Sequence, residues 1–102
     1  MKLHLSPIRG STPLAAERMG DTLLLNGDLF DFSDLAEGDT IDGAAYSENW
    51  FVGPVTHADG QIILQVLLPH GANAPQETLF PSTLIIDTDG PVPLPPYTRW
   101  PD

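Results

Sequence analysis

The dipeptides Asn26-Gly27 and Asp59-Gly60, each flanked by alternating apolar residues, constrain the fold of this chain more than any other feature. Asn-Gly and Asp-Gly tolerate a positive φ at both central positions of a two-residue turn, as a type I′ hairpin turn requires. Flanked by apolar alternation, such a dipeptide is the strongest short-range signal for a β-hairpin. The sequence therefore predicts two hairpins, over residues 22–32 and 51–68.

The first turn fixes a register in which Leu23 lies opposite Phe30. Because side chains alternate between the two faces of a hairpin, one face gathers the apolar residues. These residues are Leu23, Leu25, Phe30 and Phe32. We expect this face to be buried.

The second turn places His57 opposite Ile62 and, further from the turn, Phe51 opposite Leu68. Gly53-Pro54 interrupts the first strand of this hairpin. Proline has no N–H to donate, so this strand is predicted either to lie at a sheet edge or to contain a bulge that shifts the parity. The second strand, 61–68, is predicted to be central. Its core-facing residues would be Ile62, Leu64, Val66 and Leu68.

Asp89-Gly90 has the composition of a third hairpin turn, but prolines follow it at 91, 93 and 95. These prolines remove the N–H groups that the returning strand would donate. Residues 83–88 still read as a strand. Residues 91–95 then pair through Val92 and Leu94 in another register or form polyproline II.

The remaining segments have less regular patterns. Residues 13–19 fit either a helix ending at Gly20 or a strand entering a Gly20-Asp21 turn, and the spacing to the next turn favours the strand. Residues 33–49 read as a loop with one helical turn at 43–48, and residues 69–81 as a long, Pro-stiffened loop.

These elements predict a mainly β fold. We expect a small single-domain antiparallel sheet, curled into a sandwich- or barrel-like core, with at most one short helix. The length of 102 residues and the hydrophobic content of 41% suit one globular domain. Residues 1–94 form the predicted domain, and residues 95–102 form a Pro-rich tail.

The charge distribution excludes two classes of partner. The net charge is −10, and no Lys or Arg occurs between Arg18 and Arg99. Binding a phosphate backbone or an anionic membrane needs several cations on one face, so we expect neither nucleic acid nor membrane as a partner. No apolar stretch approaches the roughly 18–20 residues of a membrane-spanning helix. The first ten residues do not read as a signal peptide, and the lack of cysteine fits a reducing cytoplasm.

The sequence predicts no metal site, no cofactor and no catalytic site. His4, His57 and His70 are scattered, whereas zinc needs three or four converging ligands. Asp28 and Asp31 would face opposite sides of a strand. There is no nucleophile elbow, phosphate-binding loop or dinucleotide fingerprint, so we do not expect an enzyme.

Five residues are the candidates for contact with a partner protein. Trp50 opens a strand and lies on the face opposite Phe51. It either packs in the core or covers a second layer or an interface. Tyr97 and Trp100 are aromatic residues among prolines, which either fold back on the domain or face a partner. The stiffened 69–81 loop contributes His70 and Asn73.

WFVGPV at 50–55, LLPHGANAPQETLFP at 67–81 and NGDLFDFSDL at 26–35 together resemble a small uncharacterised protein family. Members are encoded in phages and prophages of proteobacteria, often near late structural or tail genes. The resemblance spans most of residues 1–94 and leaves out the tail. It supplies no catalytic residue.

The resemblance implies a non-enzymatic interaction protein, such as a tail-associated structural, assembly or accessory factor. It would act in the cytoplasm of the bacterial host, with incorporation into the virion left open, and its partner would be another protein. Two alternatives remain: an acidic mimic of nucleic acid that inhibits a basic host protein, and an uncharacterised enzyme or metal-binding module.

Overall fold

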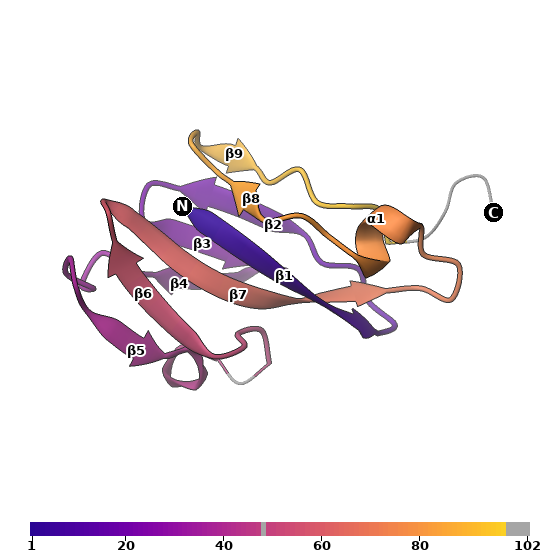
Figure 1. Cartoon of the computed structure of the whole chain (residues 1–102), viewed down its shortest axis with the longest axis horizontal. Helices are drawn as coiled ribbons and strands as arrows, with labels where there is room; N and C mark the ends of the chain where they lie inside the picture. The colour runs from indigo at the N-terminus through magenta and orange to yellow at the C-terminus, as the bar shows by residue number, and fades with distance from the viewer. Residues whose placement is uncertain (48, 98–102) are drawn as a thin grey trace.

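The computed structural model describes residues 1–47 and 49–97 and confirms a mainly β fold built from two sheets (Figure 1). The first sheet has the strand order β5 (Thr40–Asp42), β6 (Pro54–Ala58), β7 (Gln61–His70), β1 (Lys2–Arg9) and β8 (Leu84–Ile85). The second has the order β4 (Asp28–Asp31), β3 (Thr22–Leu25), β2 (Ala16–Met19) and β9 (Gly90–Pro91). Two short helical elements complete the described chain: a 3-10 turn at Gly43–Ala45 and the helix α1 at Gln76–Leu79.

The first predicted hairpin forms as β3 and β4 in the predicted register. Leu23 pairs with Phe30. Asn26 and Gly27 have φ values of 48° and 89°, so both central turn residues lie in the left-handed region that favours Asn and Gly. The segment 13–19, for which a strand was favoured, contains strand β2, which reaches β3 through the turn at Gly20-Asp21.

The second hairpin contains a bulge next to Gly53-Pro54. His57 pairs with Ile62 as predicted, but Phe51 bridges to Val66 and not to Leu68. The strand is not an edge strand, because β5 pairs with its other side. The bulge moves the register by two residues, so the predicted change of parity does not occur and Phe51 stays in the core with 7% exposure.

Asp89-Gly90 links the two sheets and does not close a hairpin. Before it, β8 pairs with β1 in the first sheet; after it, β9 pairs with β2 in the second. The predicted strand 83–88 is therefore reduced to two residues. The prolines do not prevent all pairing, because the Val92 N–H donates to the Ala16 carbonyl at 2.9 Å. Of the two residues predicted to pair, Val92 does so, whereas the Leu94 N–H donates to the nearby Val92 carbonyl at 2.9 Å.

The centre of the first sheet is a parallel pair that the sequence did not predict. β1 runs parallel to β7 over eight paired positions, from Lys2–Ile63 to Arg9–His70. The pairing brings Leu3 beside Leu64 and so extends the core face of β7. Strand β5 and helix α1 were also not predicted.

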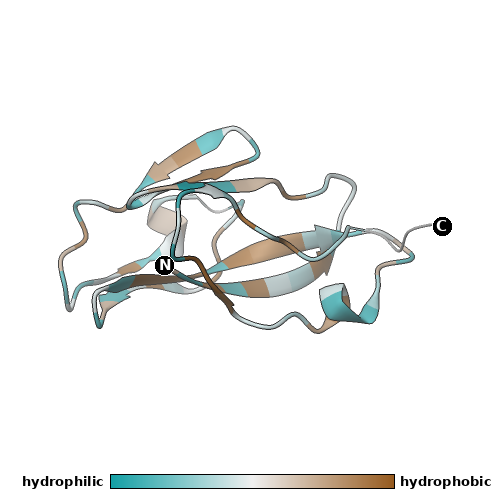
Figure 2. Cartoon of the chain, turned by 90° about the horizontal axis from the view of Figure 1, so that it is seen from above, coloured by the Kyte–Doolittle hydropathy of each residue, from teal (hydrophilic) through white to brown (hydrophobic). Residues whose placement is uncertain are grey.

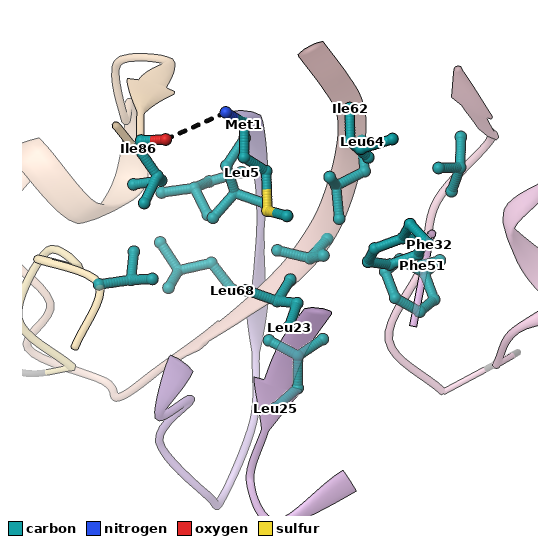
Figure 3. Packing of buried hydrophobic residues seen from close by; sticks show 14 of the residues in the cluster. Met1, Leu5, Leu23, Leu25, Phe32, Phe51, Ile62, Leu64, Leu68 and Ile86 are labelled. Atoms are coloured by element: carbon teal, nitrogen blue, oxygen red, sulfur yellow. Dashed lines mark hydrogen bonds between the residues drawn. The ribbon is translucent and has the colours of Figure 1, made fainter. Parts of the chain in front are cut away.

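The core lies between the two sheets (Figure 3). The first sheet contributes Leu3, Leu5, Ile62, Leu64, Val66 and Leu68, and the second contributes Leu23 and Leu25. All four predicted residues of β7 are buried. Along β7, buried and half-buried residues alternate, because successive side chains face opposite sides of the sheet. The strands carry both hydrophobic and hydrophilic residues (Figure 2).

The amino group of Met1 lies at one end of this core (Figure 3). It donates to the Ile86 carbonyl at 3.0 Å, and the Arg18 side chain donates to the same oxygen at 2.9 Å. Burial first, and then the charge of Arg18, hold the pKa of the Met1 amine below its usual value of 8.0.

The depressed pKa predicts how stability changes with pH. The unfolded chain holds this proton more tightly than the folded chain, so the free energy of unfolding should rise with pH from the lowered folded pKa to just above 8.0. Urea melts at several pH values can be compared for the free and the N-acetylated chain. The free chain should gain stability relative to the acetylated chain across this window; a relative loss would contradict the assignment.

Candidate interaction surface

The segment 93–97 folds back onto the end of the molecule that carries α1. Tyr97 is tied at two points: its carbonyl accepts from the Gly71 N–H at 2.8 Å, and its hydroxyl donates to the Gly10 carbonyl. The hydroxyl of Thr78, which is fully buried, donates to the Pro96 carbonyl at 2.5 Å. The described part of the tail is therefore fixed to Gly10, directly after β1, to the loop after β7 and to α1.

This folded-back segment forms one wall of a groove of about 330 Å³. The groove is lined by Glu77, Phe80, Ser82, Leu84, Pro93, Leu94, Pro95 and Pro96. Phe80 follows α1 and is 75% exposed, which is the highest value among the large hydrophobic side chains of the described chain. We call this feature the Phe80 groove.

The Phe80 groove combines polar and apolar surface and has a stiff wall. Pro93, Pro95 and Pro96 have fixed φ angles and offer no N–H, so this wall is conformationally restricted. Glu77 and Ser82 provide polar groups at the lining. Such a surface suits the side chains of an extended protein segment.

The predicted contact residues do not all meet. His70 and Tyr97 lie near each other at this end: the His70 Nδ1 is 3.0 Å from the Gly71 carbonyl, and the Gly71 N–H donates to Tyr97. Asn73 is exposed in the same loop. Tyr97 also lines a second hollow of about 410 Å³, together with Arg9.

Trp50 lies apart from this group. Its indole N–H donates to the Asp28 carboxylate at 3.2 Å, and its half-buried ring packs against the core. Trp50 thus packs at the boundary between the two sheets, beside Asp28 of β4. Trp100 lies outside the described residues.

Sequence reasoning missed Phe80, the most exposed aromatic side chain within residues 1–47 and 49–97. Phe80 lies in the sequence ETLFP, which has no alternation of polar and apolar residues. The sequence therefore does not indicate whether this side chain faces the core or the solvent. Pro81 directly after it was the one available signal, since proline ends regular structure and leaves the preceding residue at a surface turn.

The histidines have separate local partners. The His57 Nδ1 is 2.7 Å from the Leu35 carbonyl, and the His57 side chain is partly buried. Within residues 1–47 and 49–97, no three His, Cys, Asp or Glu side chains are grouped closely enough to hold a metal ion. Nor does this part of the chain contain a helix long and apolar enough to cross a membrane.

No protein-family model, curated protein or solved structure matches this chain.

Proposed function

We propose that this chain is a non-enzymatic interaction protein of phage or prophage origin, acting as a tail-associated structural, assembly or accessory factor. The observation that carries the proposal is the exposed Phe80 ring on a proline-walled groove. The family resemblance supports the phage setting; its most specific part, PHGANAP at 69–75, lies just before helix α1 and Phe80.

Two physical features support a role in binding. An exposed phenyl ring beside further apolar side chains gains free energy when a partner removes it from water. The hydrogen bonds at Thr78 and Tyr97 already hold the groove in place, so little ordering remains to oppose binding. Aromatic side chains at the centre of a contact are common binding hot spots.

The test is capture of partners in induced lysogens, read by quantitative mass spectrometry. We expect Phe80→Ser to reduce recovery of the captured proteins roughly tenfold or more, as loss of a hot-spot side chain does. Met19→Ser is the matched control. Met19 is 47% exposed and lies on β2 of the second sheet, away from the groove, so its loss should leave recovery unchanged. Equal recovery with Phe80→Ser would overturn the assignment of the groove.

Two further variants separate the parts of this end. Ala substitution of both His70 and Asn73 tests the loop, and deletion of residues 98–102 tests the end of the tail. If capture survives the loop substitutions and is lost with the deletion, the tail carries the contact. Mass spectrometry of purified virions decides between a cytoplasmic factor of the host cell and a virion component.

The carboxylates favour a second candidate, an acidic inhibitor that imitates nucleic acid. Twelve of the fourteen carboxylates lie between Arg18 and Arg99, a stretch with no Lys or Arg. Such a protein would occupy a basic host protein through charge complementarity. The captured proteins would then bind nucleic acid, and double-stranded DNA would displace them from the chain; capture unaffected by DNA would reject this candidate.

A further inference from the structure

A third hollow, of about 320 Å³, lies beside β5. Strand β5 lies toward the opposite end of the molecule from α1 (Figure 1). It is lined by Asp34, Leu35, Asp39, Thr40, Ile41 and Tyr46. Leu35 is buried, Ile41 is 38% exposed, and the Tyr46 ring packs edge-on against Phe32. The lining therefore combines an apolar surface, a fixed aromatic ring and two carboxylates.

The carboxylates of this hollow lack a cationic partner within the described chain. Asp39 accepts a neutral donor, the Ala36 N–H at 3.0 Å. Asp34 has no hydrogen bond or ion pair to a described residue. Burial, and then the nearby charges of Asp34 and Asp31, raise the pKa of Tyr46 above its usual value of 10.0. The hollow therefore has a negative potential and a neutral phenol at physiological pH.

The outer edge of the strand beside this hollow pairs with no strand of the described chain. β5 is the terminal strand of its sheet. The Asp39 carbonyl accepts from the His57 N–H at 3.0 Å, and the Gly43 N–H donates to the Gly53 carbonyl at 2.8 Å. Because backbone direction alternates along a strand, the N–H and C=O groups of Thr40 and Asp42 point away from β6. These groups can pair with an added strand.

The charge of the edge decides which strand can add. Asp42 lies on β5, and Asp39 directly precedes the strand. A second copy of the chain would bring another net charge of −10 to this edge. Like charges facing each other across an interface disfavour this self-association. A basic extended segment meets no such repulsion, so charge complementarity selects it.

We propose that the β5 edge and its hollow bind an extended peptide with an arginine side chain. The peptide backbone pairs with Thr40 and Asp42. The alkyl part of the arginine lies on Leu35, Ile41 and Tyr46, and the guanidinium lies between Asp34 and Asp39. Arginine fits better than lysine, because its planar group bonds to carboxylates and stacks on an aromatic ring. This site is separate from the Phe80 groove.

The probe is a fluorescein-labelled peptide with the sequence Thr-Val-Thr-Arg-Thr-Val-Thr, titrated by fluorescence anisotropy at low salt. We expect saturable binding that Asp34→Asn weakens roughly tenfold, because it removes a charged hydrogen-bond partner. Asp59→Asn is the matched control: it removes one carboxylate at the β6–β7 turn, where Asn tolerates the φ of 53°. It should change the affinity less than about twofold.

The peptide itself supplies a second control. Replacing its arginine with citrulline keeps the shape and removes the charge, and this should abolish binding; lysine should bind more weakly than arginine. No saturable binding to the unaltered chain up to millimolar peptide would overturn the proposal. Equal binding of the citrulline peptide, or an equal loss with Asp59→Asn, would overturn it as well, since either result shows that the hollow does not recognise the guanidinium.

Discussion

Phe32→Ala is expected to lower the free energy of unfolding by about 3–5 kcal/mol, the usual cost of removing a buried phenyl ring. Phe32 is fully buried. Its ring makes edge-to-face contacts with Tyr46 and Phe51, at centroid distances of 4.8 Å and 5.9 Å. The substitution removes these contacts and leaves a cavity between the two sheets. Urea denaturation followed by circular dichroism measures the loss.

The same substitution at Phe80 is the control. Phe80 is 75% exposed, so Phe80→Ala should change the free energy of unfolding by less than about 0.5 kcal/mol. The pair therefore separates the two roles of phenylalanine in this chain, in the core and on the groove. A loss at Phe80 equal to the loss at Phe32 would show that the Phe80 ring packs against the protein.

The local part of the fold could be predicted because turn chemistry and side-chain alternation act over a few residues. Asn26-Gly27 fixes the pairing of Leu23 with Phe30 without any knowledge of the rest of the chain. The pairing of β1 with β7 has no such signal. Lys2 and Ile63 are joined by a chain of sixty residues, and a parallel pair has no turn between its strands.

The bulge shows a limit of a different kind. Gly53-Pro54 predicted an interruption, and Gly53 has a φ of 69°, which glycine adopts readily. The number of inserted residues depends on how Phe51 packs in the core. The observed shift of two residues keeps the Phe51 side chain inward, whereas a shift of one would expose it.

The surfaces were less predictable than the core. The length and the prolines of the 69–81 loop predict that it contacts a partner protein. Its exposed ring, Phe80, could not be distinguished by residue type from the fully buried Phe32. The hollow beside β5 also escaped prediction, because it brings Tyr46 next to Asp34 and Asp39 through the fold of residues 33–49, which carry no periodic pattern.

Leu64→Ala tests the register of the central strand and is expected to cost about 2–5 kcal/mol. Leu64 is 1% exposed and lies on β7, which β6 and β1 flank on either side. Because β7 is hydrogen-bonded to a strand on each side, the backbone around Leu64 cannot move far to fill the lost volume. The expected cost therefore lies toward the upper part of this range.

The matched control for Leu64→Ala is Gln65→Ala on the same strand, because the next residue faces the opposite side of the sheet. Gln65 is half-buried and contributes no side chain to the core cluster, so its loss should cost less than about 1 kcal/mol. Denaturant melts of both variants give the two values directly. A one-residue slip of β7 would exchange the faces of the strand and reverse the order of the two costs. A cost below about 0.5 kcal/mol for Leu64→Ala would therefore contradict both the burial of this side chain and the register that the Asp59-Gly60 turn sets.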